Sequence, residues 1–153
     1  MYMKIYIGAD HRGFGLKVDL VSYLQVNNYE VVDMGAKEYI EDDDYSDYGI
    51  KVGEVVVSDV GSLGILVCGT GVGASIAANK VKGIRAGLCT TEEIARLAIN
   101  DDDINVLALN SDLHDDLDIA VKIVDTFLST PFENSEKRVR RIQKITNYEQ
   151  NLI

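Results

Sequence analysis

The sequence of 153 residues lacks the features that mark secreted and membrane proteins. No apolar run approaches the ~20 residues that a transmembrane helix needs, and no signal peptide precedes the first strand-like segment. Cysteine is scarce as well: Cys68 and Cys89 are the two present, which favours free thiols in a reducing compartment over a disulfide. We therefore expect a cytoplasmic protein that does not contact membranes.

Basic residues are also few. The chain has 25 acidic and 15 basic side chains and a formal net charge of -10. This charge disfavours nucleic acid as a partner, because the nucleic-acid backbone is itself anionic. An anionic ligand would need local bases and backbone N–H groups. No histidine stands at metal-ligand spacing from either cysteine, so the sequence predicts no metal site.

The chain has one proline and no repeat, linker or low-complexity tract, so residues 1–153 are expected to form one domain. Short apolar runs alternate with segments of helical period, and the acidic residues 38–47 are expected to form an exposed loop. The expected strands are residues 4–9, 29–34, 64–68, 84–89 and 106–109, and the expected helices are 15–24, 48–58, 74–80, 94–99, 117–128 and 135–152. This order predicts a three-layer, Rossmann-like α/β fold, with helices on both faces of a mostly parallel sheet.

The most distinctive motif is Cys68-Gly69-Thr70-Gly71-Val72-Gly73, which lies between a buried strand and a helix. Its alternate glycines let the backbone approach a ligand, and the helix start that follows directs N–H groups at an anion or a developing oxyanion. A thiol in this position tends to have a lowered pKa, which suits a base or a nucleophile. The residues alone leave open a plain tight turn for the loop and a small buried hydrophobe for Cys68.

Asp10 and His11 follow the first strand, so they should lie at the same end of the sheet as Cys68. There they would bind a sugar hydroxyl or a phosphate. The alternative is that Asp10 caps the next helix and His11 is simply exposed. The other histidine, His114, has acidic neighbours and is expected in a solvated loop.

The carboxyl-terminal helix is amphipathic and basic. Its bases are Lys137, Arg138, Arg140, Arg141 and Lys144. In an acidic chain they form a local cation patch, and arginine suits bidentate recognition of phosphate. A charged stripe opposite an apolar face is otherwise ordinary solvated surface.

These motifs resemble those of the type B ribose-5-phosphate isomerase family, which includes the subunits of galactose-6-phosphate isomerase. The similarity extends over nearly the whole chain. It is strongest in Gly-Ala-Asp-His-Arg-Gly-Phe at 8–14, Asp-Tyr-Ser-Asp-Tyr at 44–48, the nineteen-letter run Cys-Gly-Thr-Gly-Val-Gly-Ala-Ser-Ile-Ala-Ala-Asn-Lys-Val-Lys-Gly-Ile-Arg-Ala at 68–86, and the segment 105–109.

The resemblance implies a cofactor-free isomerisation of an aldose phosphate to a ketose phosphate through an enediolate. Cys68 corresponds to the base that moves a proton between C1 and C2. Thr70 and the backbone groups of residues 69–75 correspond to the set that stabilises the enediolate oxygen. Substrate contacts are implied for Asp10, His11, Tyr45, Gly69, Gly71, Val72, Gly73, Ser75, Asp102, Lys137 and Arg141, with Arg140 as a further candidate.

Three positions depart from the family pattern. The ring-opening histidine of the family falls on Asp101, its neighbouring substrate-binding asparagine on Asp102, and a phosphate-binding arginine on Asp112. The usual Gly-Gly-Arg-His segment is Asn-Ser-Glu-Lys at 134–137. An aspartate repels the phosphate that an arginine attracts. We therefore expect Asp101 to act in ring opening, and His11 with the carboxyl-terminal bases to hold the phosphate.

Three interpretations follow. The first is an active isomerase that converts ribose 5-phosphate to ribulose 5-phosphate. The second is an isomerase of another sugar phosphate, of the galactose 6-phosphate type, or one whose site is completed by a paralogous subunit. The third is a catalytically weakened subunit that binds sugar phosphate. The resemblance also implies a homodimer or tetramer with active sites at the subunit interface.

Overall fold

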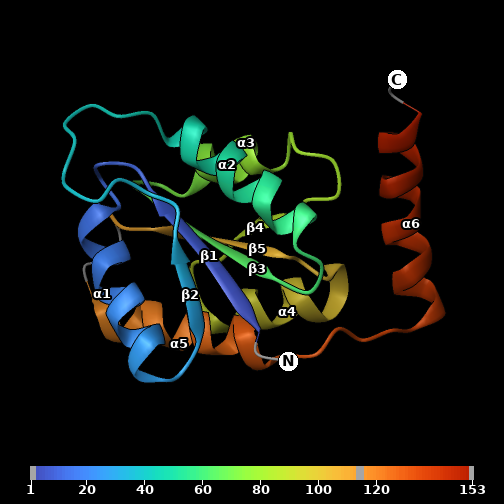
Figure 1. The fold of residues 1–153 in the computed structure, drawn as a ribbon. Helices are drawn as coiled ribbons and strands as arrows, with labels where there is room; N and C mark the ends of the chain where they lie inside the picture. Colours follow the sequence, from blue (N-terminus) through green and yellow to red (C-terminus); the bar gives the residue numbers. More distant parts are fainter. Residues whose placement is uncertain (1–2, 113–115, 152–153) are drawn as a thin grey trace.

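The computed structural model describes residues 3–112 and 116–151. Its sheet has five strands, all parallel, in the order β2-β1-β3-β5-β4 (Figure 1). The strands are β1 (Lys4–Ala9), β2 (Glu30–Asp33), β3 (Leu63–Cys68), β4 (Ala86–Leu88) and β5 (Val106–Asn110). The central strand β3 and its neighbour β5 are nearly or wholly buried, as expected for apolar runs covered on both faces.

Six helices surround this sheet (Figure 1). They are α1 (Phe14–Val26), α2 (Tyr45–Ser58), α3 (Val72–Ala78), α4 (Glu92–Asp102), α5 (Leu117–Ser129) and α6 (Glu136–Gln150). Apolar side chains of α1, α4 and α5 form one buried cluster with one face of the sheet, and those of α2 and α3 form a second cluster with the other face. The predicted three-layer α/β fold is therefore confirmed.

Most element boundaries differ by one to three residues from the sequence prediction, and two of these differences have a clear physical reason. Helix α2 begins at Tyr45, one turn before the expected start, because the acidic segment contributes its N-cap at Asp44 and a first-turn acid at Asp47. A carboxylate there is favourable beside the positive end of the helix dipole. Strand β4 is shorter than expected, because the backbone N–H of Arg85 donates to the side-chain oxygen of Asn105 (2.8 Å) rather than to a strand.

Helix α6 stands beside the body of the molecule (Figure 1), and none of its residues is buried. Polar contacts connect it to the body: Arg138 forms ion pairs with Asp101 and with Glu133, and Glu149 accepts a hydrogen bond from the backbone N–H of Gly83 (3.1 Å). None of the helices in the described part of the chain is long and apolar enough to cross a membrane. His114, expected in a solvated loop, lies outside the described residues.

Candidate active site

The site begins where the strand order reverses, between β1 and β3. Their register pairs Ala9 with Val67, so the next residues, Asp10 and Cys68, also lie side by side. On the other side of β3, Cys68 pairs with Asn110 of β5. These three polar side chains therefore form a row at the carboxyl end of the sheet, where open α/β sheets bind ligands. All three are nearly buried, with exposed fractions of 4%, 4% and 1% in that order.

Cys68 is held by the glycine loop that follows it. The backbone N–H of Gly71 donates to Cys68 Sγ over 3.1 Å, which holds the sulfur against the loop. Gly71 adopts a left-handed backbone with φ of 77°, which puts this N–H in place. The second cysteine, Cys89, is a free, buried thiol whose pKa is raised to about 11 by its burial. Cys68 is therefore the thiol suited to proton transfer.

The other two glycines of the loop leave room for side chains of this chain that lie against them. A Cβ at Gly69 would come within 2.2 Å of the Arg12 guanidinium, and one at Gly73 within 2.6 Å of the Tyr45 ring. Tyr45, predicted to line the site, therefore covers the start of α3. Arg12 was not predicted, and its only signal in the sequence is its position directly after Asp10 and His11.

Three loop residues expected to contact substrate reach the surface around Cys68. Thr70 and Val72 are exposed, and Ser75 is half-buried. The Thr70 hydroxyl accepts a hydrogen bond from the Val72 N–H (3.3 Å), and the Ser75 hydroxyl donates to the Val72 carbonyl (2.8 Å). These bonds fix the first turn of α3 next to the thiol.

Asp10 and His11 are held in different ways. Asp10 Oδ1 accepts a hydrogen bond from the N–H of Gly13 (3.0 Å), so this carboxylate closes the turn that leads into α1. His11 is half-buried and its ring contacts Asp43. Asp43 belongs to the acidic loop and was not predicted as a site residue. Its contact with His11 raises the pKa of the imidazole, mainly through the side-chain hydrogen bond.

The residues that follow β5 contact the other loops of the site through hydrogen bonds and an ion pair. The Ser111 hydroxyl donates to the carbonyl oxygens of Arg12 (3.0 Å) and Cys68 (3.2 Å). The Asp112 N–H donates to the Gly69 carbonyl (3.0 Å), and its carboxylate forms an ion pair with Arg12. The negative charge of Asp112, which would repel a phosphate, is thus balanced by a cation within the same chain.

Asp101 and Asp102 do not lie near Cys68. Both end helix α4, which runs from the carboxyl end of β4 back to the start of β5, so they lie at the amino end of the sheet. The sequence prediction that combined Asp101 with Cys68 does not hold within one chain. Parallel strands joined by a crossover helix put the two residues at opposite edges of the sheet.

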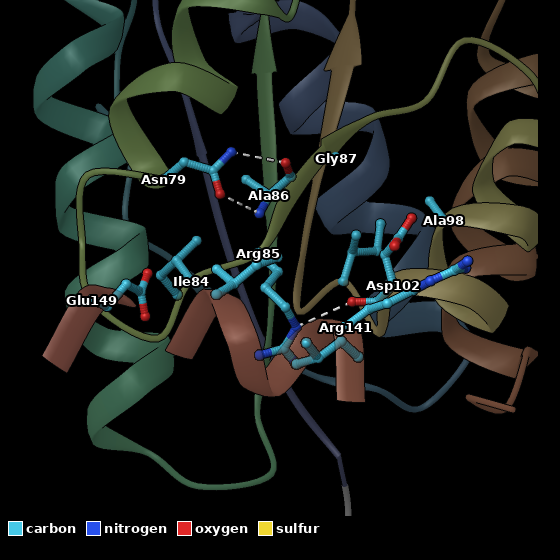
Figure 2. A pocket seen from close by; sticks show the side chains of 12 residues that line it. Asn79, Ile84, Arg85, Ala86, Gly87, Ala98, Asp102, Arg141 and Glu149 are labelled. Carbon is cyan, nitrogen blue, oxygen red and sulfur yellow. Dashed lines mark hydrogen bonds between the residues drawn. The ribbon is translucent and has the colours of Figure 1, made fainter. Parts of the chain in front are cut away.

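The basic residues of α6 lie near these two aspartates. Arg138 forms an ion pair with Asp101. Asp102 and Arg141 line a cavity of about 430 Å³ between α6 and the sheet, shown in Figure 2 with Arg85, which donates to the Asp102 carbonyl (3.2 Å). The other two predicted bases of α6, Lys137 and Arg140, are exposed. The predicted site residues therefore form two groups, one around Cys68 and one around Asp101.

Asn110 is a further residue that the sequence did not indicate. Its side-chain nitrogen and oxygen are buried, and neither has a hydrogen-bond partner among the described residues. Burying an unpaired amide costs stability. We expect Asn110→Leu, which keeps the number and branching of the side-chain heavy atoms, to raise the free energy of unfolding by about 1–2 kcal/mol in urea titrations.

Asn105 provides the matched control for this substitution. Its amide accepts from the Arg85 N–H (2.8 Å) and donates to the Gly83 carbonyl (2.9 Å), so Asn105→Leu should lower the free energy of unfolding by about 1–3 kcal/mol. Equal destabilisation by the two substitutions would show that the Asn110 amide is satisfied in the folded protein.

Comparison with known proteins identifies the family of this chain. The protein-family description "Ribose/Galactose Isomerase" matches residues 5–145. The chain is 43% identical over 150 residues to the probable ribose-5-phosphate isomerase B of Mycoplasma genitalium, covering 97% of each chain. It is 42% identical over 147 residues to ribose-5-phosphate isomerase B of Escherichia coli K12, covering 96% of this chain and 97% of that one.

Solved structures agree with this result. Ribose-5-phosphate isomerase B of Clostridium thermocellum superposes with a TM-score of 0.93 at 44% identity, over 99% of this chain and 100% of the other. The Mycoplasma genitalium enzyme with bound ribulose-5-phosphate gives a TM-score of 0.93 at 41% identity, over 99% of both chains. The fold is an open, parallel α/β sheet with a thiol and a glycine loop at its switch point. The chain belongs to the ribose/galactose isomerase family, as its sequence motifs predicted.

Proposed function

We propose that this protein is a cofactor-free sugar-phosphate isomerase that interconverts ribose 5-phosphate and ribulose 5-phosphate, a reaction of the pentose phosphate pathway. The observation that carries the proposal is Cys68 at the sheet's switch point, with a backbone N–H donating to its sulfur. Relatives of about 40% identity are named ribose-5-phosphate isomerase B, and one of them was solved with ribulose-5-phosphate bound.

In the proposed reaction, the Cys68 thiolate removes the proton on C2 of the open-chain aldose. The electron pair of that C–H bond forms the C1–C2 double bond of the enediolate, and the negative charge moves to the C1 oxygen. Backbone N–H groups of the loop at 69–73 and the Thr70 hydroxyl would stabilise this oxygen. The thiol then returns a proton to C1 as the C2 carbonyl forms, and the proton of the C2 hydroxyl passes to the C1 oxygen, so no oxidant or reductant is needed.

We further propose that two copies of the chain build each active site. The group around Cys68 and the group around Asp101 lie at opposite edges of the sheet in one chain, and α6 buries none of its residues. A second copy would bring its Asp101 to Cys68 as the acid or base that opens the sugar ring. Asp102, Lys137 and Arg141 would accompany it as substrate contacts, in at least a homodimer.

Co-expression of two inactive variants tests this arrangement. Cys68→Ala and Asp101→Asn should each be inactive alone. If each site takes Cys68 from one chain and Asp101 from the other, half of the randomly paired dimers are mixed and contain one intact site of two. The co-expressed pair should then recover about a quarter of wild-type activity. Recovery of no activity from mixed dimers would contradict a site shared between chains.

The acidic residues at Asp101 and Asp102 favour a second candidate, an isomerase of another sugar phosphate such as galactose 6-phosphate, with a paralogous subunit. A panel of five- and six-carbon aldose phosphates separates the two: the first proposal requires the highest kcat/KM with ribose 5-phosphate. Preference for a six-carbon substrate supports the second candidate. Binding of ribose 5-phosphate without turnover would instead indicate a sugar-phosphate-binding subunit.

A further inference from the structure

Asp43 is the most buried carboxylate of the acidic loop, with 11% of its side chain exposed. Its oxygens are held by three donors. The backbone N–H of His11 donates to Asp43 Oδ1 (2.6 Å), the His11 ring contacts the same oxygen through Nδ1 (3.1 Å), and the Tyr48 hydroxyl donates to Oδ2 (2.8 Å). This loop residue thus links the end of β1 to helix α2.

The contact fixes which ring nitrogen of His11 is available to a ligand. An ionised carboxylate only accepts hydrogen bonds, so Nδ1 must carry the proton that faces Asp43. Among the described residues, the ring's hydrogen bonds all use Nδ1, to the Asp43 side chain and to its carbonyl (3.3 Å). The other nitrogen, Nε2, is left for a ligand on the side of the ring away from Asp43.

We infer that Asp43 is a positioning residue for His11: it accepts the Nδ1 proton and so orients the imidazole with Nε2–H toward the anionic group of the substrate beside the Cys68 loop. The inference rests on the proposed function only for the identity of that anion. Asp43 and Asp10 are the charged groups that act on the ring, and both favour its protonated form. Tyr48 holds Asp43 in turn, and burial followed by the Asp43 hydrogen bond raises the pKa of this phenol to about 12, so it remains a donor at neutral pH.

A positive charge on His11 would compensate for Asp112, which departs from the family pattern. The carboxylate there stands where the resemblance implies a phosphate-binding arginine, and it forms an ion pair with Arg12. A cationic His11 next to the glycine loop supplies positive charge on the β1 side instead. The phosphate preference of the site would then depend on the protonation of His11.

The first test does not depend on activity. The chain has two histidines, so NMR titration of the ring protons follows both, and His114→Gln identifies the His11 signal. Asp43→Asn should lower the pKa of His11. The matched control is Asp42→Asn, which removes the same charge one residue away, at an exposed position whose φ of 63° asparagine tolerates, and it should leave the pKa in place.

The wild-type protein provides a readout that needs no variant. Above the pKa of His11, its neutral ring should carry the proton on Nδ1, as measured by ¹⁵N chemical shifts. An Nε2–H tautomer, or a His11 pKa unchanged by Asp43→Asn, would overturn the inference. A wild-type protein that passes these tests but does not isomerise ribose 5-phosphate would refute the proposed function and leave the positioning role of Asp43 standing.

Kinetics then test the role in binding. At a pH between the His11 pKa of the Asp43→Asn protein and that of the wild type, as the NMR titrations give them, Asp43→Asn should raise KM for ribose 5-phosphate by up to about tenfold, with a smaller change in kcat, because the neutral ring binds phosphate poorly. At a pH below both pKa values the difference should shrink, because His11 is then protonated in both proteins. A KM that rises equally at both pH values would contradict the role and indicate a structural one.

Discussion

Replacement of Cys68 by alanine should lower kcat for ribose 5-phosphate isomerisation by about a hundred- to ten-thousandfold, the usual contribution of a positioned general base. The substitution removes the sulfur that accepts the Gly71 N–H but leaves the row of strand ends intact. The fold should therefore persist, with a small loss of stability from one missing buried atom. Steady-state assays of a folded variant, checked by circular dichroism, measure this effect.

Cys89 is the matched control, because it is the other cysteine and is also buried. Burial raises its pKa to about 11, so it supplies almost no thiolate at neutral pH. Cys89→Ala should remove a similar volume from the core and keep kcat within a few-fold of wild type. If Cys68→Ala were as active as Cys89→Ala, Cys68 would not be the base.

The second large effect is expected from Gly71→Ala. Its φ of 77° is costly for a residue with a side chain, by about 1–2 kcal/mol. The new Cβ would also lie within 2.4 Å of Leu88 Cδ1 and 3.0 Å of the Leu109 carbonyl oxygen. The loop must shift to relieve these contacts, and the N–H that faces Cys68 Sγ shifts with it. We expect kcat/KM to fall by about a hundredfold or more, in the range reported for the loss of one oxyanion donor.

Gly61→Ala is the control that separates the effect of backbone strain from the effect of a shift in the loop at 69–73. Gly61 has a similarly positive φ of 90°, but a Cβ there has no atom within 4 Å. Gly61→Ala should therefore lower the free energy of unfolding by about 1–2 kcal/mol while leaving kcat/KM unchanged. Thermal unfolding of both variants measures the loss of stability, and steady-state kinetics measure the change in kcat/KM. A Gly71→Ala protein with wild-type kcat/KM would show that the loop geometry is not part of catalysis.

Much of the fold could be predicted from the sequence, because apolar runs and helical periods alternate along the chain. The runs at β3 and β5 are long enough to be covered on both faces, which identifies the centre of a parallel sheet. The sequence prediction starts α2 one turn too late, because it assigns the acidic residues to a loop, although acids in a first turn stabilise a helix.

The site was predicted where it depends on strand ends and missed where it depends on long-range contacts. Asp10 and Cys68 follow adjacent parallel strands, so their proximity could be predicted. Asp43 is 32 residues from His11 in the sequence, and nothing in an acidic loop indicates which carboxylate turns inward. The separation of Asp101 from Cys68 follows from the predicted element order, because a residue shortly before a parallel strand lies at the opposite end of the sheet from one that ends a strand.

The most direct test of the account is the conversion of ribose 5-phosphate by the purified wild-type protein in D₂O, followed by NMR, with Cys68→Ala in parallel. Proton transfer through an enediolate predicts that wild-type protein produces ribulose 5-phosphate carrying deuterium at C1, because the base exchanges its proton with solvent. The Cys68→Ala protein should produce almost none. Absence of ribulose 5-phosphate with the wild type, or its formation at the same rate by Cys68→Ala, would contradict the account.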